Sequence, residues 1–451
     1  MLPTTSEYYC LLVVVFFAFW LLRGSGRASV GLVLLVNLFF YARWGWSYLA
    51  LVPAAATVDF FLARAIAGTG RKPIQRLPIS ISIAMNLGLI VFCRYAPATG
   101  LFLPLTLSFY AFQALTYTLD IYRGDTRPVG YLTYLTSVTF FPTVAAGPIT
   151  RVAALAPQWN WKGKTLTSEE GGRALFLIGL GLAKKFLIAD YLGNNLVNRV
   201  FDLPTLYSGG DVLLGVYAYA FQLYYDFSGY SDIAIGSALL LGIRLPANFN
   251  APYRATNLAD FWRRWHITFS NWLRDYLYFS LPGKRTKWMP YLGLVITMVA
   301  GGVWHGANGT FAIWGLLHGV GLALFRFWQA ARRGAKASES RGIKIGAGLL
   351  TFHFVLLAWI FFRAASVATA LQILSQIGSL HWNVVNATPQ FVLVLAIAAA
   401  CHFVPKDWYD LSLLNFNRTP AVLQAAAMTL LLLAIRTVSS TGAAPFIYSK
   451  F

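Results

Sequence analysis

The sequence predicts an all-α polytopic membrane protein, on two observations. Hydrophobic residues make up 57% of the chain and charged residues only 12%, whereas a soluble domain carries about 25% charged residues. Apolar stretches that approach the roughly 20 residues needed to span a bilayer as a helix recur along the chain. They cover residues 8–22, 79–92, 291–303, 346–362, 391–404 and 421–435 with their flanks. Because several are short, we expect tilted or re-entrant pieces among them.

The charge distribution predicts an orientation. The net charge of +20 comes from 36 Lys and Arg against 16 Asp and Glu, as expected for basic cytoplasmic loops under the positive-inside rule. The lipid bilayer is therefore the expected partner, and nucleic acid is not. Basic residues follow the first and third helices and the segment 105–122, which places the N-terminus outside. Continued along the chain, the same alternation places the C-terminal tail outside as well.

We expect one membrane domain over residues 1–451. It divides into N-terminal helices at 1–98, a core with the candidate catalytic histidines at 99–330, a basic cytoplasmic linker at 331–345, and C-terminal helices with an outer tail at 346–451.

Two segments stand out in apolar surroundings, and the first is predicted to be broken or re-entrant. Residues 140–151 hold Pro142 and Pro148 around Ala-Ala-Gly, which a continuous helix does not comfortably accommodate. The polar, glycine-containing segment 226–232 interrupts another apolar region. Its carboxylates, Asp226 and Asp232, either pair with Arg side chains or Tyr hydroxyls between helices or line a cavity.

Residues 257–278 are predicted to form a basic, aromatic amphipathic helix at the membrane interface. Helical spacing places Trp262 and His266 on its apolar face and Arg263 and Arg264 elsewhere. A plain interfacial anchor explains the tryptophans and arginines. It does not explain a histidine on the apolar face.

The glycine-rich stretch 301–319 carries two of the six histidines, His305 and His318. An ionisable group in an apolar run is a candidate functional group, and the glycines around His305 permit close helix approach. On one continuous helix the two imidazoles would lie about 20 Å apart, so a shared metal site is not expected. We therefore expect His305 to be the general base, a role that its ordinary pKa suits, and His318 to be structural.

Five stretches in order, between about residues 100 and 325, carry a family resemblance. They are 107–113 with 120–124, 140–151, 221–232, the WRRWH run at 262–266, and the WHG triplet at 304–306. Together they resemble the membrane-bound O-acyltransferase (MBOAT) family, in its bacterial branch of alginate O-acetylation and D-alanyl transfer proteins.

The resemblance implies a fold and a site. The fold is an MBOAT-like ring of tilted transmembrane helices with re-entrant segments around a central tunnel and funnel. His305 corresponds to the essential histidine of the WHG motif, and His266 lines the same path. The residues expected to line the tunnel or contact substrate are Trp304, Trp262, Asn308, Asp226, Asp232, Arg263 and Arg264.

The resemblance also implies an activity in the bacterial cytoplasmic membrane. An acyl group, expected to be acetyl, passes from a cytoplasmic thioester such as acetyl-CoA to an extracytoplasmic polysaccharide. We expect no permanently bound cofactor and no metal. An extracytoplasmic SGNH-hydrolase-like acetyltransferase is the expected partner, through which the polysaccharide is modified. Arg263 and Arg264 would suit an anionic donor.

The tail PFIYSKF at 445–451 resembles the aromatic C-terminal ending common in this branch. Tyr448 is accordingly a candidate acyl acceptor, and a plain anchoring role for the tail is the alternative.

Two other classes of function stay open from the sequence. A polytopic transporter would use Asp226, Asp232 and the broken segment 140–151 as a midplane site, although no inverted repeat is visible. A non-catalytic scaffold of a polysaccharide export complex would not need His305.

Overall fold

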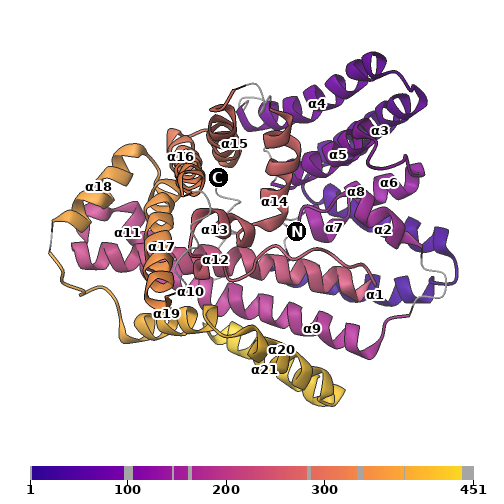
Figure 1. The fold of residues 1–451 in the computed structure, drawn as a ribbon. Coiled ribbons are helices and arrows are strands. Elements are labelled where there is room, and N and C mark those ends of the chain that lie inside the picture. The colour runs from indigo at the N-terminus through magenta and orange to yellow at the C-terminus, as the bar shows by residue number, and fades with distance from the viewer. Residues whose placement is uncertain are drawn as a thin grey trace. The chain divides into compact units, whose positions relative to one another are not determined.

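The computed structural model describes residues 3–95, 105–144, 147–160, 165–281, 286–332, 340–379 and 381–438. Every regular element in these ranges is a helix (Figure 1), which confirms the all-α prediction. Five of the described helices are long and apolar enough to cross a membrane, or six if a bent pair counts as one span. The chain is thus a multi-pass membrane protein.

The chain divides into two compact units, which are described separately. The first comprises Met1–Gly181 and Tyr230–Ala247, and the second Leu182–Gly229 and Asn248–Phe451.

The first unit begins with five helices of 16 to 24 residues and continues mostly with shorter ones. They are α1 (Ser6–Leu21), α2 (Gly26–Ala42), α3 (Trp46–Gly68), α4 (Lys72–Tyr95), α5 (Leu105–Arg123), α6 (Tyr131–Val138), α7 (Phe141–Val144), α8 (Val152–Leu155), η2 (Ala156–Trp159) and α9 (Ser168–Leu182). Helix α3 packs against both α4 and α5. The buried carboxylate of Asp59 on α3 accepts hydrogen bonds from Ser82 Oγ (2.6 Å) and Asn86 Nδ2 (2.8 Å) on α4.

The predicted break in the segment 140–151 is confirmed, because α7 ends at Val144 and the next helix begins at Val152. The buried side chain of Asn37 supplies partners beside this break. Its Oδ1 accepts from the backbone N–H of Phe141 (2.9 Å), and its Nδ2 donates to the carbonyl of Thr136 (3.3 Å). These bonds satisfy backbone groups that the ends of α6 and α7 leave open.

The second unit contains the remaining helices. They are η3 (Ala183–Ala189), α10 (Asp190–Leu192), η4 (Gly193–Val197), α11 (Asn198–Asp202), η5 (Pro204–Leu206), the first part of α12 (Gly209–Leu240), η6 (Pro252–Arg254), α13 (Leu258–Arg264), α14 (Ile267–Trp272), η7 (Leu273–Leu277), η8 (Tyr278–Ser280), α15 (Met289–His305), α16 (Gly309–Ala331), α17 (Arg341–Arg363), α18 (Val367–Gly378), α19 (Pro389–His402), α20 (Lys406–Arg418) and α21 (Ala421–Val438). Of these, η3, η4 and η7 are π-helical.

The polar segment 226–232 does not interrupt the helical backbone. Helix α12 runs without a break through it. The expectation that the carboxylates of this segment pair between helices holds for Asp226, although the partner is a lysine and not the predicted Arg or Tyr. Asp226 on this helix pairs with the ammonium of Lys185 at 2.6 Å. A polar side chain that finds a charged partner leaves the backbone hydrogen bonds of the helix undisturbed.

The predicted continuous helix over 257–278 was wrong. Helix α13 ends at Arg264 and α14 begins at Ile267. Between them Trp265 is extended and His266 has left-handed backbone angles, φ 41° and ψ 55°. The two helices therefore leave His266 at a break and not on the face of one helix.

The stretch 301–319 is a hairpin of α15 and α16, with His305 at the end of the first helix. Glycines bring the two backbones together. A Cβ added to Gly302 would lie 2.2 Å from the carbonyl oxygen of Phe311, and one added to Gly315 would lie 2.4 Å from that of Met298. The close helix approach predicted at the glycines around His305 is confirmed at Gly302, whereas Gly309 meets nothing within 4 Å and the contact at Gly315 was not predicted. Small residues at the interface are typical of membrane helix pairs.

We predict that Gly315→Ala destabilises the protein by about 1–3 kcal/mol, because the added methyl group would force the α15 and α16 backbones apart. The measurement is the thermal unfolding of purified protein in detergent. Gly346→Ala in α17 is the matched control, since a Cβ there meets nothing within 4 Å, and its melting temperature should equal or exceed that of the wild type. Equal melting temperatures for Gly315→Ala and wild type would contradict the hairpin packing.

Candidate active site

His305 ends α15 inside a wall of aromatic rings. Its side chain is buried, and its ring centroid lies 4.5 Å from that of Trp304, 5.3 Å from that of Trp314 and 5.0 Å from that of Phe362. The next residue is the extended Gly306, where a Cβ would lie 2.1 Å from the ring of Phe311. Only glycine fits there without displacing that ring.

His266 contacts the same group of aromatic rings, here called the aromatic cluster. Its buried ring stacks on Phe269 at 5.0 Å and meets Phe227 edge-on at 4.6 Å. Phe269 in turn contacts His305, with ring centroids 5.9 Å apart. The structure therefore places both predicted histidines against one phenyl ring, although 39 positions separate them in the sequence.

The protonation state of His266 follows from its surroundings. It lies between α13 and α14, outside the apolar helices that are long enough to span a membrane. Burial lowers the pKa of its imidazole to about 3, because the charged form loses its hydration. The ring is consequently neutral at physiological pH, and one of its nitrogens can accept a hydrogen bond.

The third histidine of this region, His318, contacts the cluster from α16. Its Nδ1 accepts a hydrogen bond from the indole Nε1 of Trp262 at 3.3 Å, which fixes the neutral tautomer with the proton on Nε2. Trp314 lies between the two imidazoles of the hairpin, 5.3 Å from His305 and 5.1 Å from His318. The helix break thus brings these histidines to one indole, contrary to the separation expected for a continuous helix.

Two other predicted site residues lie beside His305. Trp304 packs on Phe269 at 4.5 Å and so joins the same cluster. Asn308 caps α16 by accepting a hydrogen bond from the backbone N–H of Thr310 (3.4 Å), and its amide nitrogen donates to the carbonyl of Ala365. Asn308 therefore holds the turn that follows the WHG triplet.

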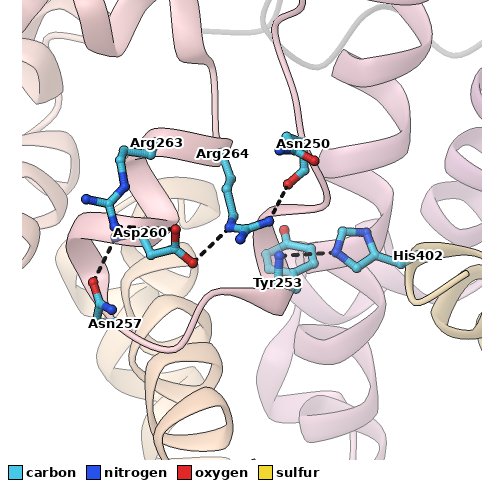
Figure 2. Close-up of polar contacts among 7 residues, drawn as sticks. All are labelled: Asn250, Tyr253, Asn257, Asp260, Arg263, Arg264 and His402. Carbon is cyan, nitrogen blue, oxygen red and sulfur yellow. Dashed lines mark hydrogen bonds and ion pairs between the residues drawn. The ribbon is translucent and has the colours of Figure 1, made fainter. Parts of the chain in front are cut away.

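Arg263 and Arg264 share one carboxylate. Asp260 lies between them (Figure 2) and accepts from Arg264 Nε at 2.8 Å and from Arg263 at 3.5 Å. Arg264 also donates to the carbonyl of Asn250 (3.3 Å), so much of its hydrogen-bonding capacity serves local structure. Arg263 is the more exposed of the two and keeps a guanidinium surface for an anion.

A buried ionic cluster surrounds Lys185, which sequence analysis missed. Its ammonium lies 2.6 Å from Asp226 Oδ1 and 2.8 Å from Asp190 Oδ1, and all three side chains are less than 8% exposed. The pair of lysines, Lys184 and Lys185, within the apolar run 174–189 was the available signal. Asp232, predicted beside Asp226, lies six positions further along α12 and is half-buried.

The remaining candidate, Tyr448, lies outside the residues that the structure describes. Across the described ranges no three His, Cys, Asp or Glu side chains are grouped so that they could hold a metal ion. The groups that could perform chemistry at the aromatic cluster are the imidazoles, which suit proton transfer.

We predict that Lys185→Met destabilises the protein by about 3–5 kcal/mol, because it leaves buried carboxylates without their cation. Thermal unfolding in detergent measures the loss. The triple variant Lys185→Met, Asp190→Asn, Asp226→Asn removes the charges together and should recover part of the stability. If Lys185→Met and the wild type have the same melting temperature, the ionic cluster does not stabilise the packing of these helices.

The model of the membrane-bound O-acyltransferase family matches residues 105–370. Peptidoglycan O-acetyltransferase of Helicobacter pylori is 36% identical over 384 residues, covering 76% of this chain and 72% of that protein.

Two further relatives extend the range of named activities. "Probable alginate O-acetylase" of Pseudomonas aeruginosa is 35% identical over 395 residues, covering 82% of this chain and 73% of that protein. Teichoic acid D-alanyltransferase of Bacillus subtilis is 30% identical over 271 residues, covering 57% of this chain and 67% of that protein. The resemblance noted in the sequence is confirmed, and the chain belongs to the membrane-bound O-acyltransferase family, as an acyltransferase enzyme.

Proposed function

We propose that this enzyme transfers an acetyl group from a cytoplasmic thioester, acetyl-CoA or a related donor, across the membrane for O-acylation of an extracytoplasmic polysaccharide. The observation that carries the proposal is the pair of buried imidazoles, His305 and His266, on one aromatic cluster around Phe269. The acetylase names of two relatives support the choice of acetyl.

The chemical step needs one base and one nucleophile. The His305 imidazole removes the proton from an acceptor hydroxyl, and the oxygen attacks the thioester carbonyl carbon. The tetrahedral intermediate collapses, the carbon–sulfur bond breaks, and the imidazolium returns its proton to the departing thiolate. His266 orients the acceptor or shuttles the proton. Exclusion of water by the aromatic wall would strengthen these interactions and limit hydrolysis of the thioester.

The donor would approach from the cytoplasmic side. The exposed guanidinium of Arg263 would attract an anionic donor, while Arg264 and Asp260 hold the local backbone. No cofactor is permanently bound in this scheme, since the thioester is consumed as substrate.

The acceptor side lies outside a bacterial cytoplasmic membrane. Both chain termini face that side, as the alternation of basic loops predicts. The acetyl group passes either directly or through Tyr448 to an extracytoplasmic partner of the SGNH-hydrolase type. That partner completes O-acetylation of the polysaccharide.

We predict that His305→Ala lowers acetyl transfer at least about 100-fold, because the general base is lost. The measurement is transfer of labelled acetyl from acetyl-CoA in membranes that contain equal amounts of folded protein. His381→Ala, at an exposed histidine far along the chain, is the control and should keep wild-type activity. Wild-type transfer by His305→Ala would refute the assignment of the base.

We also predict that Tyr448→Phe abolishes passage of the acetyl group to the polysaccharide if the tyrosine is a relay. Mass spectrometry of the C-terminal peptide during turnover should then find an acetyl group on Tyr448 in the wild type. An unmodified peptide under turnover would instead point to direct transfer and leave the tail an anchoring role.

A further inference from the structure

His266 has an unusual backbone conformation that contacts with surrounding residues must stabilise. Its φ of 41° is in the left-handed region, and among the described non-glycine residues only Ala251 shares a positive φ. This conformation is costly for a residue with a Cβ. Such a conformation persists where surrounding contacts determine it, and it is frequent at functional sites.

The segment Asn248–Phe249–Asn250, here called the clamp, brackets His266 with two backbone hydrogen bonds. The N–H of Asn250 donates to the carbonyl of Arg264, and the N–H of Ile267 donates to the carbonyl of Asn248, both at 2.9 Å. These bonds fix the chain immediately before and after Trp265–His266. The turn between α13 and α14 is thereby held from outside its own sequence.

The side chain of Asn248 completes the clamp. Its Oδ1 accepts from the backbone N–H of Thr268 (3.3 Å) and from Thr268 Oγ1 (2.9 Å). The first N–H groups of a helix have no partner within it, and His266, in the N-cap position of α14, provides no side-chain cap. Asn248 therefore caps α14 from another segment, and the imidazole of His266 is left to contact Phe227 and Phe269.

The clamp is itself fixed on two sides. The ring of Phe249 packs on Trp265 and on Phe227, with ring centroids 5.1 Å apart in both pairs. Further along the same loop, the N–H of Tyr253 donates to Nε2 of His402 at 3.1 Å (Figure 2). Asn248 is 1% exposed, so its hydrogen bonds form in a low dielectric, where they are stronger than in water.

We propose that Asn248 is a positioning residue for acyl transfer, since it holds the backbone of His266 in the conformation that presents the imidazole to Phe269 and the His305 side of the cluster. The proposal rests on the function proposed above. Without the Asn248 side chain, α14 loses its cap, and Trp265–His266 can relax toward ordinary backbone angles that turn the imidazole away. Displacements of about 1 Å in a catalytic group can cost about 100-fold in rate.

The first test is Asn248→Ala, assayed as acetyl transfer from acetyl-CoA in reconstituted membranes and normalised to folded protein. The expected result is a kcat about 10- to 100-fold lower with the KM for acetyl-CoA changed less than about twofold. The matched control is Ser366→Ala, which removes a cap from α18, where Ser366 Oγ accepts from the N–H of Thr369 at 3.0 Å. Equal kcat values for Asn248→Ala and Ser366→Ala would overturn the proposal.

A second pair of variants covers the case in which Asn248→Ala does not fold. Thr268→Val removes one hydrogen bond to Asn248 with little change in shape, and Thr268→Ser keeps it. The valine variant should lower kcat several-fold and the serine variant should restore it. Wild-type kcat in Thr268→Val would count against the clamp.

A readout that needs no activity separates this inference from the proposed function. Diethyl pyrocarbonate modifies accessible neutral imidazoles, and mass spectrometry locates the adduct. Modification of His266 should rise several-fold in Asn248→Ala and stay at the wild-type level in Ser366→Ala, with buried His318 as the internal reference. Unchanged modification of His266 refutes the clamp. Failure of the wild type to transfer acetyl refutes the proposed function, while the labelling still tests the clamp.

Discussion

Backbone hydrogen bonding in apolar surroundings is the constraint on which the rest of this structure depends. Wherever a helix breaks within such a region, its N–H and C=O groups must find partners in the protein, because lipid offers none. Asparagine side chains supply partners at three breaks. Asn37 bonds the α6–α7 junction, Asn248 bonds the start of α14, and Asn308 bonds the α15–α16 turn. An amide that both donates and accepts suits this task.

These breaks determine where the imidazoles point. His266 lies in the break between α13 and α14, and His305 lies at the last position of α15 before the backbone extends. A histidine in the middle of an unbroken helix would project from one helical face at a fixed spacing from its neighbours. Because the chain turns at both positions, the imidazole at the α13–α14 break and the imidazole at the end of α15 both reach the ring of Phe269.

The sequence predicted the helices and the break in 140–151, but not the break at Trp265–His266. The lengths of the apolar stretches and the distribution of charge were sufficient to predict the membrane helices. The prolines in 140–151 predicted the break there, because proline cannot donate the backbone hydrogen bond of a helix. The break at Trp265–His266 could not be predicted in this way, because it contains no proline or glycine. Hydrogen bonds with the distant residues Asn248 and Asn250 impose it. Lys185 was missed because one partner is 41 positions away and the other, Asp190, is reached through a π-helical turn.

Because the buried lysine and carboxylates are paired with one another, the imidazoles are the groups best suited to proton transfer. Buried charges are costly unless paired, and here Lys185 is held by Asp226 and Asp190. A neutral imidazole can take up a proton without breaking an ion pair, but the imidazolium so formed must be stabilised in an apolar site. The indoles of Trp304 and Trp314 lie 4.5 and 5.3 Å from the His305 ring, centroid to centroid, in a tilted and an edge-on arrangement. An aromatic wall is therefore compatible with a general base where an indole turns its face, and not its edge, to the imidazolium.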